Sequence, residues 1–82
     1  MGYYENQKKA FIKIDEKLKN ILLGKMISFK IQTFILDITE KIPVSGKCVS
    51  NRIDQLIEDR YHRLTIIDNE VTLKPEVVIN EW

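Results

Sequence analysis

The sequence predicts a single α+β domain in which three helices are followed by a short β-hairpin, and three observations carry this prediction. The chain has 82 residues, a length that suits one domain. As far as Arg60 the apolar residues recur at intervals of three and four, as on one face of a helix. Residues 64–73 change to β-branched and aliphatic side chains around a polar turn, as in a hairpin. These segments divide residues 1–82 into an N-terminal helix (1–24), a helical pair (28–60), a hairpin (63–74) and a C-terminal tail (75–82).

The first helix is predicted over residues 5–23 because its apolar side chains form one stripe. This stripe contains Ala10, Phe11, Ile14, Leu18, Ile21 and Leu22. Gly24 is expected to end the helix as a C-cap. Ile12 and Leu23 fall on a second face with Glu16 and Lys19, where they are either ordinary surface residues or part of a dimer seam.

Two shorter helices are predicted over residues 29–41 and 46–59. Ser28 and Ser45 are their expected N-caps, and Pro43 stops the first of the two. Their expected apolar faces are Ile31, Phe34, Ile35, Ile38 and Ile42 in the first, and Val49, Ile53, Leu56 and Ile57 in the second. The hairpin follows over residues 63–74, with Asp68-Asn69-Glu70 at its turn. Beyond Pro75, Val77-Val78-Ile79 is either a further strand or an interface segment.

The sequence carries no pattern that is typical of an enzyme, a metal site or a membrane protein. Cys48 is the only cysteine and His62 the only histidine, so neither a disulfide within the chain nor a zinc site is expected. Ser45-Gly46-Lys47 looks like the end of a phosphate-binding loop, but that motif needs Gly at position 41 and Ser or Thr at position 48. The longest aliphatic runs have three residues, which predicts neither export nor a membrane span. We therefore expect a cytoplasmic protein without enzymatic activity, metal or cofactor.

The stretch from Ile38 to Leu56 resembles a helix-turn-helix. Thr39 is the small residue on the first helix, Val44 is the apolar residue at the turn, and Val49 is the β-branched residue inside the second helix. Together with the hairpin, residues 5–74 are similar to a winged-helix domain. This resemblance implies double-stranded DNA as the partner, with the third helix in the major groove.

The exposed face of the third helix is the predicted DNA-reading surface. If Val49, Ile53, Leu56 and Arg60 face the core, the opposite side carries Lys47, Cys48, Asn51, Asp54, Gln55 and Glu58, with Ser50 and Arg52 on its flanks. The N-terminal half of this face holds residue types that bind base edges and phosphates. The predicted DNA-binding residues are Lys41, Ser45, Lys47, Ser50, Asn51, Arg52, Gln55 and Arg63. The other interpretation of this face is a solvated polar surface.

The charge is unevenly distributed along the chain. Residues 1–26 carry six lysines and three acids, whereas residues 64–82 carry one lysine and four acids. An acidic hairpin tip is repelled by phosphate, which favours an alternative function as a protein-interaction winged helix, a subunit or adaptor in a larger complex. The favoured function is a small transcriptional regulator that binds DNA sequence-specifically as a homodimer. Ile12, Leu23, Val77, Ile79 and Trp82 are the candidate dimer contacts.

Overall fold

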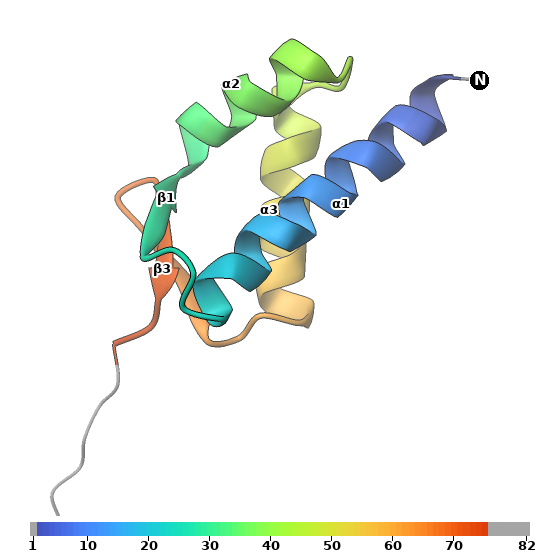
Figure 1. The fold of residues 1–82 in the computed structure, drawn as a ribbon. Helices are drawn as coiled ribbons and strands as arrows, with labels where there is room; N and C mark the ends of the chain where they lie inside the picture. Colours follow the sequence, from blue (N-terminus) through green and yellow to red (C-terminus); the bar gives the residue numbers. More distant parts are fainter. Residues whose placement is uncertain (1, 76–82) are drawn as a thin grey trace, which may run out of the picture.

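The computed structural model describes residues 2–75, which form three helices and a three-stranded antiparallel sheet (Figure 1). The elements follow one another as α1 (Gly2–Leu22), β1 (Ser28–Lys30), α2 (Ile31–Lys41), α3 (Gly46–Asp59), β2 (Leu64–Ile67) and β3 (Glu70–Leu73). The predicted α+β class, the three helices and the hairpin after them are confirmed. The predicted contacts of Val77, Ile79 and Trp82 lie outside the described residues.

Helix α1 buries four of the six residues of the predicted stripe, leaves Phe11 and Leu22 half-buried, and ends at Leu22, one residue before the predicted end. Ala10, Ile14, Leu18 and Ile21 are fully buried. Gly24 has a φ of 78°, and the N–H of Lys25 donates to the carbonyl of Asn20 at 2.8 Å, so a Schellman motif closes the helix. The helix starts at Gly2, earlier than predicted, and none of residues 2–9 is buried. Its N-terminal turns therefore extend beyond the core, as Figure 1 shows.

The predicted start of the second helix at residue 29, with Ser28 as its cap, is wrong. Residues Ser28–Lys30 form strand β1, which pairs with β3. The Ser28 hydroxyl donates to Glu70 Oε2 at 2.7 Å instead of capping a helix, and Phe29 packs into the core. Pairing with β3 satisfies the backbone polar groups of this segment, so extended geometry prevails there over helix. Helix α2 begins at Ile31, the N–H of which donates to the carbonyl of Asn69 at 2.9 Å.

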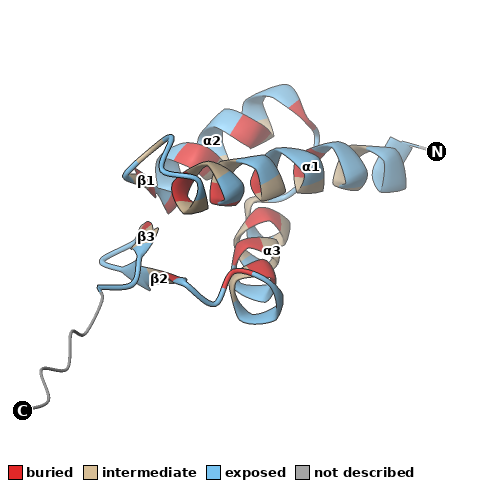
Figure 2. Cartoon of the chain, turned by 60° about the horizontal axis from the view of Figure 1, so that its bottom comes forward, coloured by how far each residue is buried: buried red, intermediate tan, exposed pale blue. Residues whose placement is uncertain are grey.

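Helix α3 has the predicted bounds and cap. The Ser45 hydroxyl accepts a hydrogen bond from the N–H of Cys48 at 3.1 Å. Val49, Ile53 and Leu56 are buried against α1 and α2. Figure 2 shows the buried positions on one side of α3, with exposed positions along the rest of the helix.

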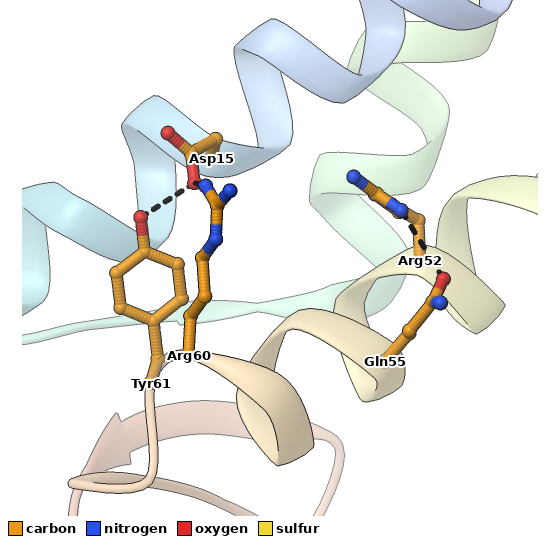
Figure 3. A network of polar contacts seen from close by, with 5 residues as sticks. All are labelled: Asp15, Arg52, Gln55, Arg60 and Tyr61. Carbon is orange, nitrogen blue, oxygen red and sulfur yellow. Dashed lines mark hydrogen bonds and ion pairs between the residues drawn. The ribbon is translucent and has the colours of Figure 1, made fainter.

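The prediction that Arg60 faces the core is wrong, because Tyr61 takes the inner position. Arg60 is exposed and its Nη1 lies 3.8 Å from Asp15 Oδ1, whereas Tyr61 is only 6% exposed. The Tyr61 hydroxyl donates to the same Asp15 oxygen at 2.5 Å. Burial and the neighbouring Asp15 carboxylate raise the pKa of Tyr61 to about 12. These contacts attach the loop after α3 to α1 (Figure 3).

The sheet has the strand order β1-β3-β2 and stacks against the helices through alternate residues. Leu64 on β2 and Val71 on β3 are fully buried. The two strands are joined by Asp68 and Asn69, with φ values of 51° and 63°, which identifies a two-residue type I′ turn. This turn has the right-handed twist that a tight hairpin needs.

Candidate nucleic-acid interface

The N-terminal half of α3 presents several of the predicted DNA-binding residues on one surface. Ser45, Lys47 and Asn51 are exposed, and they line a shallow hollow together with Phe11, Cys48, Arg52 and Gln55. Phe11 comes from α1 and the other six residues come from α3 and its cap. This end of α3 is also the positive end of the helix dipole, which favours a negative charge near it. The surface therefore combines amide, hydroxyl and ammonium groups suited to bases and phosphates.

Arg52 does not lie on an exposed flank, contrary to prediction. Its guanidinium carbon lies 4.3 Å from the centroid of the Phe11 ring. Its Nη1 donates to Gln55 Oε1 at 3.2 Å, as Figure 3 shows. Its Nε is buried and finds no hydrogen-bond partner within residues 2–75. The planar guanidinium stacks well on an aromatic ring, which explains why the side chain folds back onto α1 instead of extending into water.

Gln55 is oriented by this contact with Arg52. One lone pair of its amide oxygen is occupied by the Arg52 N–H, so the side chain is held while its amide nitrogen keeps its donors. Gln55 is itself exposed. The Arg52–Gln55 pair thus presents a positioned donor next to Asn51, the side chain of which is unpaired among the described residues.

The remaining predicted contacts are distributed around this surface. Lys41 ends α2 just before the turn to α3, and its exposed ammonium lies 3.4 Å from Asp37. Ser50 is half-buried and does not line the hollow. Arg63 precedes β2 at the opposite end of α3 and borders a different hollow with Leu73 and Lys74. The structure therefore groups Ser45, Lys47, Asn51, Arg52 and Gln55, and it separates Arg63 from them.

Two α1 residues that the sequence pattern does not predict here, Gln7 and Phe11, complete this surface. The apolar spacing places Phe11 on the buried stripe, yet Phe11 is half-buried and its ring packs against the Arg52 guanidinium. The Gln7 amide donates to Cys48 Sγ at 3.6 Å and to the Tyr3 hydroxyl oxygen at 3.0 Å. Gln7 and Cys48 are 41 positions apart, so no local pattern could have shown that they meet.

The C-terminal half of α3 has a different character. Asp54 and Glu58 line a hollow between α3 and β2 that also contains His62 and Lys74. The tip of the hairpin carries the exposed Asp68. The acids Asp54 and Glu58 give this half of α3 a more negative surface than its N-terminal half, which carries Lys47 and Arg52.

Apolar side chains of the β2–β3 hairpin are also exposed. Ile66, Ile67 and Leu73 are 36%, 51% and 40% exposed. Only alternate strand residues can face the core, so the adjacent Ile66 and Ile67 cannot both be buried by it. The hairpin therefore presents exposed apolar side chains next to its acidic turn.

Comparisons with protein-family models, with curated proteins and with solved structures gave no match. None of the helices in residues 2–75 has both the length and the apolar composition that crossing a bilayer requires. Within the same residues, no three His, Cys, Asp or Glu side chains gather in an arrangement that could hold a metal ion.

Proposed function

We propose that this chain is a winged-helix domain that binds double-stranded DNA sequence-specifically and acts as a small transcriptional regulator. The observation that supports this proposal is the exposed polar surface on the N-terminal half of α3, next to a capped helix start. Recognition helices insert into the major groove mainly by their N-terminal residues. The acidic C-terminal half of α3 would then point away from the phosphates.

The amides of α3 and the lysines that flank the turn before it have distinct chemical roles in this proposal. The Asn51 amide can donate to N7 and accept from N6 of adenine in a paired contact. Gln55, held through its oxygen by Arg52, offers donors to guanine or thymine acceptors. Lys47 and Lys41 are exposed at the two sides of the turn between α2 and α3, where they can contact the phosphate backbone.

The test is binding of the chain to random and selected duplex DNA at two salt concentrations. Affinity is expected to fall steeply with salt, as it does when lysines displace counterions from DNA. Asn51→Ala should lower affinity for the selected site by about 5- to 150-fold, corresponding to a discrimination of roughly 1–3 kcal/mol, and leave binding to random DNA unchanged. Lys47→Ala should weaken binding to all sequences and reduce the salt slope by about one.

Gln32→Ala is the matched control, because Gln32 is an exposed amide on α2 rather than α3. It should change neither specific nor random binding. If Asn51→Ala binds the selected site like Gln32→Ala, the assignment of the α3 surface is wrong.

The second candidate function is binding of another protein through the hairpin. Exposed Ile66 and Ile67 lie next to an acidic turn, a combination that suits a partner with apolar and basic side chains. A folded chain that binds no duplex DNA even at about 50 mM salt would favour this function over the first.

A further inference from the structure

The side of α1 that faces away from the core has an ordered charge pattern. Glu5, Lys8, Ile12, Glu16 and Lys19 are all exposed, and at 100° per residue they lie within about 40° of Ile12 around the helix. We call these five residues the outer face of α1. Ile12 is 62% exposed, although it stands at the centre of the helix. Within residues 2–75 the four charged side chains of this face form no ion pair.

The charges on the two sides of Ile12 are opposite in sign at matched positions. Lys8 lies four positions before Ile12 and Glu16 four positions after it. Glu5 lies seven positions before it and Lys19 seven positions after it. Lys9 and Asp15, which border the face at three positions on either side, repeat the pattern.

We propose that the outer face of α1 binds the same face of a second copy of this chain, with the two helices antiparallel and the two Ile12 side chains in contact. In this arrangement Glu5 faces the partner's Lys19, while Lys8 and Lys9 lie next to the partner's Asp15 and Glu16. In a parallel arrangement each charged side chain would instead face the same residue of the partner, and like charges would meet. A two-fold symmetric interface repeats every contact, so each favourable pair occurs twice.

Two further observations are consistent with a second copy of the chain bound to the outer face of α1. A hollow between α1 and α3 adjoins Ile12, and Phe11, Asp15, Arg52 and Arg60 are among its lining residues, so an apolar side chain from the partner has a place to pack. The α1 residues before Ala10, including Glu5 and Lys8, are not covered by the core of their own chain. An antiparallel partner helix would cover them.

The proposed contact between the two α1 helices is narrow, so the dimer that it forms should be weak. One isoleucine per chain lies at its centre and the rest is charged, so the dimer should be weak and should dissociate as salt is added. None of the outer-face residues lies on α3. The dimer can therefore be tested without DNA, and failure of either proposal leaves the other intact.

The experiment is sedimentation equilibrium of the full chain at low and high salt, with charge reversals at the two ends of the face. The parent is expected to dimerise at low salt and to dissociate at high salt. Glu5→Lys and Lys19→Glu should each weaken the dimer by about tenfold or more, because each places like charges together twice. A mixture of the two variants should form a one-to-one heterodimer, and the double variant should dimerise like the parent, because both restore opposite charges.

Lys13→Glu is the control, because Lys13 is an exposed α1 residue about 100° from Ile12 around the helix. It should leave dimerisation close to that of the parent, and far-UV circular dichroism should show all variants folded. A parent that stays monomeric at low salt overturns the proposal. It is equally overturned if the folded single reversals match Lys13→Glu, or if the mixture and the double variant do not recover the dimer.

Discussion

Replacing Arg52 with alanine is expected to destabilise the fold by about 1–2 kcal/mol, although the side chain carries a charge and borders solvent. Its guanidinium stacks on Phe11 at 4.3 Å from the ring centroid, a contact that contributes about 0.5–2 kcal/mol depending on how dry it is. The hydrogen bond to the exposed Gln55 adds roughly 0.5 kcal/mol, and the aliphatic stem adds packing. Part of this loss is offset, because the parent spends free energy on burying Nε without a hydrogen-bond partner and the alanine variant does not.

Urea unfolding followed by far-UV circular dichroism measures this effect. A loss of 1 kcal/mol in a domain of this size lowers Tm by about 4–8 °C. Asn51→Ala is the control, because Asn51 is exposed and should change stability by less than about 0.5 kcal/mol. The stability of Arg52→Lys should lie between those of Arg52→Ala and Asn51→Ala, because an ammonium keeps the charge but loses the planar stacking on the ring. If Arg52→Ala is as stable as Asn51→Ala, the packing of Arg52 on α1 does not hold in solution.

Three other substitutions test the contacts that organise the fold. The pKa of Tyr61 is raised to about 12 because its hydroxyl is buried and donates to Asp15. The neutral hydroxyl therefore stabilises the fold fully below pH 10, the pKa of tyrosine in the unfolded chain, and this contribution is lost as the pH rises towards 12. The stability difference between the parent and Tyr61→Phe should therefore shrink over pH 10–12 in denaturant titrations, and a constant difference would contradict this explanation. Asn69→Gly should stabilise the type I′ turn by about 0.5 kcal/mol, because glycine adopts a φ of 63° without steric cost; a lower Tm would contradict this. Ser45→Ala should lower the free energy of unfolding by roughly 0.5–2 kcal/mol, because the Cys48 N–H loses its cap. An unchanged urea midpoint would contradict this expectation.

The three helices, and the side of each that is buried, follow from the spacing of apolar residues along the chain. The spacing of Ala10, Ile14 and Leu18 allows one orientation of α1, because an α-helix returns to the same side every three to four residues. The same rule selects Val49 and Ile53 in α3. The polar residues at the N-terminal half of α3 were predicted as exposed on this basis, and Lys47, Asn51 and Gln55 are exposed. Their function as DNA contacts stays a prediction.

Three features that bear on function depend on contacts between elements that lie far apart in the sequence. Strand β1 exists because Phe29 meets Val71 on β3, and residues 28–30 read in isolation fit the start of a helix equally well. Tyr61 replaces Arg60 on the inner side because the chain leaves helical geometry at the end of α3 and Asp15 on α1 accepts its hydroxyl. Arg52 turns back from the exposed surface because Phe11 offers an aromatic face. In each case the deciding partner lies about 40 or more positions away along the chain. Local periodicity reports the geometry of one element, whereas the choice of a distant partner depends on how the elements pack, and no short stretch of sequence contains that information.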